Sequence, residues 1–270
     1  MLKKNMKLKS WRNIGFVGFI VLLLMLGAYS SFKPQAVTAF RPLLRSAEET
    51  MVSYQTRSDQ QIETENFIIK YQSIDEELLQ FIAETAEDKY REATAVFQYE
   101  PKDKVLLVVY NDPNRMMKTV MLNKEKPPMG VYYGNALHIL DPTLWVNEGQ
   151  DLEQVFYEEG PILHELVHLL TDHVAKGNFP HWFTEGVSLY FEYEVDGYEW
   201  GRGVTLSEVY DLEALTYGFH QMNQYEAYTK SFRLVNAFVE EYGRQALINL
   251  IEELGEGKDP EKVLAIFNEF

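Results

Sequence analysis

Apolar residues follow two kinds of spacing in the first half of the chain, and each kind predicts a different element. Short apolar runs are typical of strands. The last such run contains Gly134-Asn135, a possible turn, and therefore forms either one strand or two. These runs are 67–71, 105–110 and 130–140. Helical spacing covers 75–97, and Asp112-Pro113 supplies a capping residue and a first-turn proline for a helix of about ten residues.

From residue 151 to the end, the apolar spacing is helical nearly throughout. The predicted helical segments are 151–174, 181–195, 207–215, 225–242, 244–254 and 260–270. A first half that mixes strands with helices, followed by a run of helices, predicts an α+β fold. In this fold a small N-terminal mixed sheet with helices precedes a helical C-terminal lobe.

The N-terminus has a different pattern, with a basic end followed by an apolar run. Residues 1–12 contain five basic residues and no acidic one, whereas 14–29 contain no charge. Extended to 14–32 the run has 19 residues, just enough for a helix to span a bilayer. The pattern predicts a membrane anchor or a signal peptide, which small residues would allow to be cleaved after Ser30 or Ala39. The positive-inside rule places the rest of the chain outside the cytoplasm, anchored in the cell membrane or secreted.

The segment between the apolar run and the first strand, 34–65, is polar and contains Pro34 and Pro42. We interpret it as a tether that leads into the folded part. The remainder, 66–270, is predicted to be one domain, with a sheet-containing lobe over 66–174 and a helical lobe over 175–270.

Composition narrows the possible functions. The formal net charge of −16 argues against nucleic-acid binding, which needs a basic face. The absence of cysteine excludes a disulfide scaffold, a cysteine nucleophile and a cysteine-ligated zinc site. A metal site in this chain must therefore use histidine and carboxylate ligands.

Such a pattern occurs in the apolar segment around 161–170, which has the spacing of a buried helix and contains His-Glu-x-x-His. His164 and His168 are four residues apart, so a helix directs both imidazoles toward one ion. Glu165 lies one position round the helix, where it can reach a water at that ion. Two ligands with a general base beside them are the signature of zinc metallopeptidases. The alternative is a pair of core histidines without a metal.

A catalytic zinc usually has three protein ligands, and the sequence offers several candidates for the third. They are Asp172, His173, His181, Glu185 and Glu192. Asp172 continues the row of His164 and His168, but a straight helix cannot easily place three successive turns around one tetrahedral ion. His181 lacks the spacing and the glycine of metzincin sites. For Glu185 the alternative role is that of an exposed carboxylate near a helix N-terminus.

The string Trp182-Phe183-Thr184-Glu185-Gly186 after the HELVH motif resembles the second zinc-ligand helix of gluzincins. From about residue 66 to its end, the chain resembles the peptidase MA-like group, distant relatives of thermolysin and of zinc aminopeptidases. The resemblance implies a zincin-like fold with one Zn²⁺ ion in a cleft between the lobes. It also implies metal ligation by His164, His168 and Glu185, and amide hydrolysis with Glu165 as general base. The gap of 16 residues between His168 and Glu185 is shorter than in thermolysin and requires a compact loop.

Related enzymes stabilise the oxyanion with a tyrosine or histidine of the helical half, and by resemblance Tyr228 is the first candidate here. Other residues that could do so are Tyr225, Tyr217 and His220. The carboxylates that could orient the ligand imidazoles are Glu158, Glu159, Asp172, Glu192 and Asp211. Zincins commonly hold an extended peptide along a strand beside the motif helix, and 136–140 is the matching strand. We expect His138 within it to have a structural role.

The sequence therefore predicts an extracytoplasmic zinc peptidase, with an endopeptidase as the leading hypothesis and a peptide or protein as substrate. A zinc aminopeptidase is the runner-up, although no Gly-x-Met-x-Asn string occurs between residues 129 and 163. A catalytically silent metal-binding scaffold is the other alternative, against which the presence of Glu165 argues. The cleavage specificity, the oligomeric state and the biological role are left open.

Overall fold

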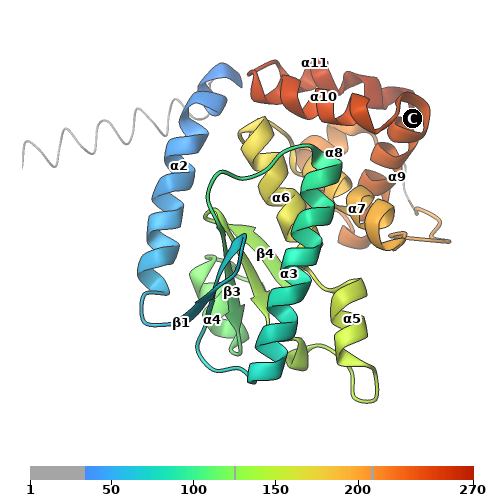
Figure 1. Ribbon diagram of the computed structural model, residues 1–270. Helices are drawn as coiled ribbons and strands as arrows, with labels where there is room; N and C mark the ends of the chain where they lie inside the picture. Colours follow the sequence, from blue (N-terminus) through green and yellow to red (C-terminus); the bar gives the residue numbers. More distant parts are fainter. Residues whose placement is uncertain (1–33, 125, 208–209) are drawn as a thin grey trace, which may run out of the picture.

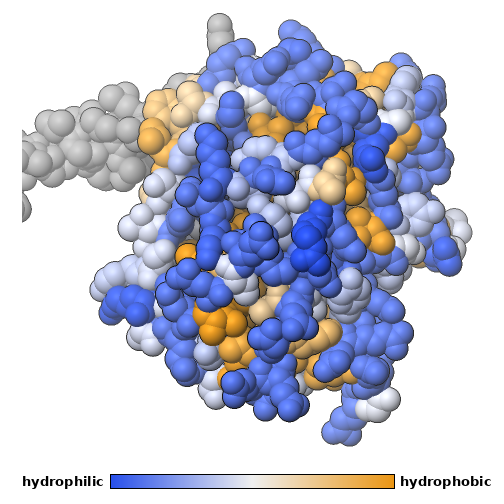
Figure 2. Space-filling model, in the orientation of Figure 1, coloured by the Kyte–Doolittle hydropathy of each residue, from blue (hydrophilic) through white to orange (hydrophobic). Residues whose placement is uncertain are grey.

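The computed structural model describes residues 34–124, 126–207 and 210–270. The predicted basic segment and anchor or signal peptide, 1–33, lie outside the described residues. Among the helices that are described, none combines the length and the apolar character needed to cross a bilayer. Hydrophilic residues cover most of the face shown in Figure 2, as the high net charge leads one to expect, and hydrophobic residues form separate patches.

Five strands of the described chain form one mixed sheet in the order β1-β2-β3-β5-β4 (Figure 1). Strands β2, β3 and β5 are parallel to one another, and the two outer strands, β1 and β4, are antiparallel to their neighbours. The strands are β1 (Gln60–Glu63), β2 (Phe67–Tyr71), β3 (Val105–Tyr110), β4 (Gly130–Tyr133) and β5 (Ala136–Leu140). The α+β prediction and the small mixed sheet are confirmed.

Alternation along the strands divides the sheet into two packed faces. Leu107 and Val109 of β3 belong to the main core, which also contains residues of α3 (Glu76–Phe97) and α6 (Ile162–Ala175). Val108 and Tyr110 face the other side, where Met116 of α4 (Pro113–Thr119) covers them. Because β3 is buried on both faces, its sequence is a continuous apolar run rather than an alternating one.

The second half is helical, as predicted, and packs against α6. Its elements are α7 (His181–Asp196), α8 (Leu212–Gly218), α9 (Gln224–Tyr242), α10 (Arg244–Gly255) and α11 (Pro260–Val263), with α5 (Leu152–Glu159) before α6. Contacts α6·α7, α7·α9 and α6·α10 join these helices around the main core. At the α7·α9 contact a Cβ on Gly186 would lie 2.5 Å from the backbone oxygen of Ser231, so glycine lets these two helices approach closely.

Three sequence-based expectations differ from the structure. The helix predicted over 207–215 begins only at Leu212, with Asp211 as its capping residue. The helix after Asp112 has seven residues instead of about ten. The strand predicted to hold substrate, β5, lies between β3 and β4 and has hydrogen-bonded neighbours on both sides. The prediction that substrate adds to β5 is therefore wrong; within the part of the chain that the structure describes, the edge strand next to α6 is β4.

The segment expected to be a tether is largely helical. Pro34–Gln55 forms α2, drawn in light blue beside the sheet and α6 in Figure 1, and β1 follows it. Val52 of this helix is completely buried, and Arg41 and Arg45 pair with Asp172 of α6. Tertiary packing therefore stabilises a helix whose own sequence contains a proline, Pro42, in its interior.

His138 of β5 has the structural role expected of it and provides a pH-dependent contribution to stability. It is fully buried, with the Tyr110 hydroxyl 2.8 Å from Nδ1 and the Tyr133 carbonyl oxygen 3.1 Å from Nε2. Burial lowers the pKa of His138 to about 4. The unfolded chain, whose histidine has a pKa of about 6.5, therefore takes up this proton first as the pH falls.

We expect this group to lower the free energy of unfolding by about 2 to 3 kcal/mol between pH 7 and pH 4.5. Denaturant titrations at both pH values, on the parent and on His138→Leu, measure the contribution. The variant should be less stable at pH 7 but should lose less stability on acidification. An equal loss in both proteins would contradict the assignment.

Candidate metal centre and active site

The two histidines of the motif project from α6 toward α7. They are one helical turn apart, so their imidazoles lie one above the other on the same helix face. A loop of five residues, 176–180, returns the chain to α7, and Lys176 and Gly177 both have positive φ angles. The Asn178 side chain donates to the carbonyl oxygens of Leu254 and Lys258, which fixes the loop on α10. This is the compact connection that the short spacing of the motifs requires.

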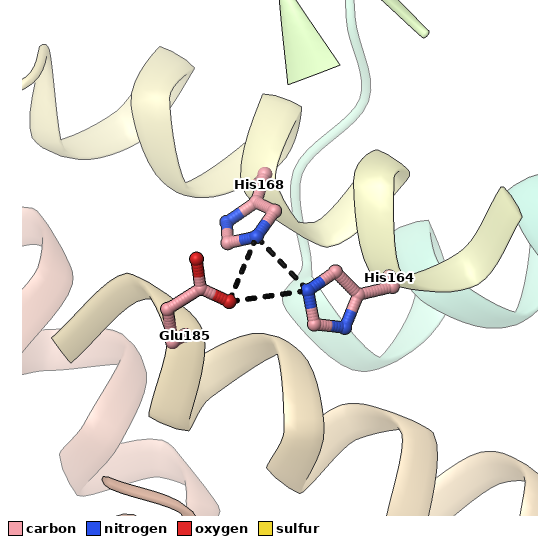
Figure 3. A group of neighbouring side chains, drawn as sticks. All are labelled: His164, His168 and Glu185. Atoms are coloured by element: carbon pink, nitrogen blue, oxygen red, sulfur yellow. Dashed lines mark hydrogen bonds and ion pairs between the residues drawn. The ribbon is translucent and has the colours of Figure 1, made fainter. Parts of the chain in front are cut away.

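Glu185 reaches the two histidines from α7, as Figure 3 shows. Its Oε2 lies 3.3 Å from His164 Nε2 and 3.5 Å from His168 Nε2, and the two Nε2 atoms are 3.0 Å apart. The structure thus brings together the three residues predicted as metal ligands. They form a cluster in which each residue offers one donor atom to a common point.

The remaining ring nitrogens are held by neighbouring side chains of α7. His164 Nδ1 lies 3.1 Å from Glu192 Oε2, and His168 Nδ1 lies 2.7 Å from Thr184 Oγ1. When each Nδ1–H donates to its oxygen partner, both Nε2 lone pairs face Glu185. Of the carboxylates considered from sequence, Glu192 is the one that orients a ligand imidazole.

Charge interactions within the cluster oppose the effect of burial. Burial by itself would raise the pKa of the Glu185 carboxyl, but His168 and His164 outweigh it and hold that pKa well below its usual range. Burial would likewise lower the pKa of His164, yet Glu192 and Glu185 raise it well above its ordinary value. The Glu185 carboxyl is thus kept ionised, the form in which a carboxylate binds a metal ion, whereas an imidazole binds a metal only through a neutral ring nitrogen.

The donor set fits zinc. Two imidazole nitrogens and one carboxylate oxygen, at bond lengths of about 2.0 to 2.1 Å around a tetrahedral ion, lie about 3.3 Å from one another. The separations of 3.0, 3.3 and 3.5 Å among Nε2, Nε2 and Oε2 match this arrangement. Three protein donors with a fourth position left over are typical of catalytic rather than structural zinc sites.

Glu165 lies beside the cluster, and strand β4 orients its carboxylate. Its Oε2 accepts a hydrogen bond of 2.6 Å from the backbone N–H of Tyr132 in β4. Gly130 of the same strand permits this approach, because a Cβ there would lie 2.5 Å from Pro161 Cβ and 3.0 Å from Glu165 Cγ. Burial raises the pKa of Glu165, whose side chain is almost completely covered. A raised carboxyl pKa suits a group that must both accept and return a proton.

Tyr228 of α9 reaches the same region. Its ring packs against Trp200 and Phe219, and its hydroxyl is hydrogen-bonded to Glu185. Burial and the neighbouring Glu185 charge raise the pKa of Tyr228, so its hydroxyl keeps its proton and can donate it in a hydrogen bond. The other residues considered for this role have different positions: Tyr225 and Tyr217 are exposed, whereas His220 lines the cleft beside His181.

These groups line one cleft with a volume of about 510 Å³. Gly130, Val131 and Tyr132 of β4 form one wall, and residues from α6, α7 and α9 line the cleft together with Arg41 of α2 and residues of the connecting segments. The free edge of β4 therefore lies beside the three-residue cluster and Glu165. An extended peptide bound along this edge would place a peptide bond near them.

Two alternative third ligands have other partners. The Asp172 carboxylate is bound by Arg41, Arg45 and Tyr132, and Glu192 contacts only Nδ1 of His164, so Glu185 is the carboxylate that faces both Nε2 atoms. His181 is partly exposed, and its Nε2 lies 3.2 Å from the second oxygen of Glu185. It contacts the cluster through Glu185, and no pattern in the sequence indicated this contact.

Sequence reasoning also missed Thr184, Gly130 and Arg41. Thr184 precedes Glu185 directly, so its spacing to His168 could have suggested it once α7 was predicted. Gly130 could have been found only by knowing that β4 crosses α6. No local signal marks Arg41, which lines the cleft from a segment more than a hundred residues before the motif.

The comparisons with known proteins agree with this picture. A family model described as the peptidase MA superfamily matches residues 83–270, well over half of the chain. The match includes α6, α7 and α9, and hence all the residues of the cluster together with Glu165 and Tyr228. No curated protein matches the chain.

Proposed function

The chain belongs to the peptidase MA superfamily, and on this premise we propose that it is a zinc-dependent peptidase with Glu165 as its general base. The observation that carries the proposal is the arrangement of His164, His168 and Glu185 at ligand spacing with Glu165 beside them. A site that only binds a metal needs ligands, whereas a carboxylate adjacent to them serves hydrolysis.

The residues that would hold a zinc ion are His164 and His168, through their Nε2 atoms, and Glu185, through Oε2. When bound, the ion supplies Lewis-acid polarisation of the scissile carbonyl and lowers the pKa of a water. Glu165 accepts the proton of the attacking water and passes it to the departing nitrogen, a transfer that its raised pKa favours. Tyr228 donates a hydrogen bond to the oxygen that becomes negatively charged. Glu192 and Thr184 keep the ligand rings oriented throughout.

The proposed substrate is a peptide segment in extended conformation. Leu140 N–H donates to the Met129 carbonyl oxygen, so Met129 and Leu140 form a hydrogen-bonded pair. In an antiparallel ladder such pairs alternate with non-hydrogen-bonded ones, and every second residue of β4, beginning with the one after Met129, therefore directs its backbone groups away from β5. Gly130 and Tyr132 are two of these, and both line the cleft; the Tyr132 N–H is bonded to Glu165, so the Gly130 backbone groups and the Tyr132 carbonyl oxygen are the ones proposed to pair with a peptide. Backbone hydrogen bonds to this edge would supply affinity without sequence preference.

We further propose that the enzyme is an endopeptidase that works outside the cytoplasm. The first point rests on the absence of an aminopeptidase-type Gly-x-Met-x-Asn string before the motif. The second rests on the basic and apolar pattern of residues 1–32, which is typical of an anchor or signal peptide. A membrane-attached or secreted form would meet peptide and protein substrates at the cell surface.

A peptide-library assay with metal analysis tests this proposal. We expect the purified full-length protein to contain about one zinc ion per chain and to cut peptides internally. Two matched libraries, with free and with acetylated N-termini, separate the alternatives. Equal cleavage of both supports an endopeptidase, cleavage of free N-termini only supports an aminopeptidase, and zinc without any cleavage supports a binding scaffold.

A further inference from the structure

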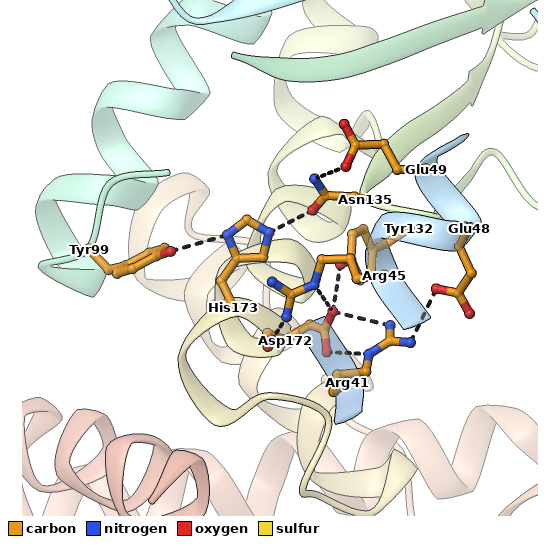
Figure 4. Close-up of polar contacts among 9 residues, drawn as sticks. All are labelled: Arg41, Arg45, Glu48, Glu49, Tyr99, Tyr132, Asn135, Asp172 and His173. Carbon is orange, nitrogen blue, oxygen red and sulfur yellow. Dashed lines mark hydrogen bonds and ion pairs between the residues drawn. The ribbon is translucent and has the colours of Figure 1, made fainter. Parts of the chain in front are cut away.

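The α2 helix is connected to the proposed catalytic centre through one buried carboxylate. Asp172 lies on α6, one turn beyond His168, and is only 2% exposed. It accepts hydrogen bonds from Arg41 Nε at 2.9 Å and Nη2 at 3.1 Å, and from Arg45 Nε at 3.0 Å. Arg45 Nη2 also donates to the Asp172 backbone oxygen at 2.7 Å. Figure 4 shows both arginines extending from α2 toward this one residue.

The same carboxylate holds the strand that lines the cleft. The Tyr132 hydroxyl donates to Asp172 Oδ2 at 2.7 Å, and the Tyr132 backbone N–H donates to Glu165 Oε2 at 2.6 Å. Tyr132 therefore bonds at its hydroxyl to the α2-linked carboxylate and at its backbone to the proposed base. A continuous series of hydrogen bonds runs from Arg41 and Arg45 through Asp172 and Tyr132 to Glu165.

Close packing fixes α2 against both halves of the molecule. Near the C-terminal end of the helix, a Cβ on Gly134 would lie 2.8 Å from Val52 Cγ2. At the N-terminal end, a Cβ on Gly257 would lie 2.9 Å from Gln35 Cα. Gly134 belongs to the β4–β5 turn and Gly257 follows α10, so α2 contacts the sheet and the helical half at once. All of α2 lies before residue 83, where the family match begins.

We propose that Arg41, Arg45, Asp172 and Tyr132 are positioning residues that set the orientation of the Glu165 carboxylate, and that α2 is thereby a working part of the catalytic domain. This inference rests on the proposed function, in which Glu165 moves the proton. None of the four residues has to touch the reacting atoms in order to act. They act through the backbone N–H of Tyr132, which occupies one oxygen of Glu165 and thus fixes the direction of the carboxylate.

Two variants remove different links of this series. Arg41→Ala/Arg45→Ala removes both cations, and Tyr132→Phe removes a single hydroxyl while keeping the ring and the backbone N–H. We expect kcat to fall about 10- to 100-fold in each, with KM changed by less than about twofold, because orientation of the base affects the chemical step more than binding. Zinc content should stay at the parent level, since the three ligands are untouched.

Combining the changes distinguishes one series from two independent effects. The triple variant combines Arg41→Ala, Arg45→Ala and Tyr132→Phe. If the arginines act through Tyr132, its kcat should be no lower than that of the slower of the two variants from which it is built. Multiplied losses would overturn the series. Tyr132→Phe is the mild variant, so it keeps the proposal testable if the loss of both arginines prevents folding.

A matched control is the Arg115–Asp59 pair. Arg115 Nη2 donates to both oxygens of Asp59 at 2.8 and 2.7 Å, and the Arg115 side chain is 21% exposed, against 23% for Arg41. It ties α4 to the segment after α2 but does not contact Asp172 or Tyr132. Arg115→Gln should lower stability and leave kcat unchanged. A fall in kcat equal to that of Tyr132→Phe would show that any loosening near α2 has the same effect, and would overturn the proposal.

Amide hydrogen exchange supplies a readout that does not depend on catalysis. The Tyr132 N–H should exchange faster in the arginine variant and in Tyr132→Phe than in the parent or in Arg115→Gln. Suppose that the parent is active, that Glu165→Gln is inactive, and that both variants keep full kcat and unchanged exchange. This result would overturn the positioning role but not the proposed function. A parent that cuts no peptide would instead refute the proposed function, and the exchange measurement would still decide whether the series couples α2 to β4.

Discussion

Replacing Glu165 by glutamine should lower peptide hydrolysis by about 10²- to 10⁴-fold while leaving the metal bound. Glutamine keeps the size of the side chain, and its carbonyl oxygen can still accept the hydrogen bond that Tyr132 N–H donates to Oε2. It cannot accept the proton of an attacking water. Steady-state kinetics on a cleaved peptide, together with zinc analysis of the same sample, measure both effects.

Glu87→Gln is a suitable control for this substitution. Glu87 is a carboxylate on α3 that accepts hydrogen bonds from Asn66 and does not line the cleft. Its replacement should affect stability and leave hydrolysis at the parent rate. If Glu165→Gln hydrolysed peptides as fast as the parent, Glu165 would not be the general base and the proposed mechanism would be wrong.

Removing a ligand should have the second large effect, on metal binding and activity together. His168→Ala deletes one of the three donors, so we expect loss of stoichiometric zinc and of measurable hydrolysis. An ion that binds only the folded state also stabilises that state, by about 4 kcal/mol when the ion concentration is 1,000 times the dissociation constant. Zinc added to metal-free protein should therefore raise the midpoint of thermal unfolding of the parent but not of the variant.

The same helix offers a matched histidine. His173 is five residues further along α6 and contacts Tyr99 and Asn135 instead of the cluster (Figure 4). His173→Ala should lose stability, because it leaves two polar partners without their contact, but should bind zinc and hydrolyse peptides. Retention of full zinc binding by His168→Ala would contradict the proposed ligand set.

Much of the fold followed from local patterns. Continuous apolar runs identified β2 and β3, and the Gly134-Asn135 turn separated β4 from β5. Asp75 and Asp112 cap α3 and α4, and α9 and α10 have nearly the predicted bounds. These signals depend only on neighbours in the sequence, which is why they could be recognised without coordinates. The order of the strands depends on contacts between distant segments, which local patterns do not record. For this reason the strand expected at the edge beside α6 was β5, whereas the edge strand there is β4.

The sequence by itself determined which residues could form the centre. His164, Glu165 and His168 share one helical turn, so helix geometry alone groups them. Glu185 followed from the resemblance of its helix to a known ligand helix. The tertiary structure decided how these residues are held: Glu192 and Thr184 on the ligand rings, Tyr132 on the base, and two arginines of α2 on Asp172. Such contacts join segments up to 131 residues apart, and no periodicity along the chain records them, because they exist only once the main core has brought the elements together.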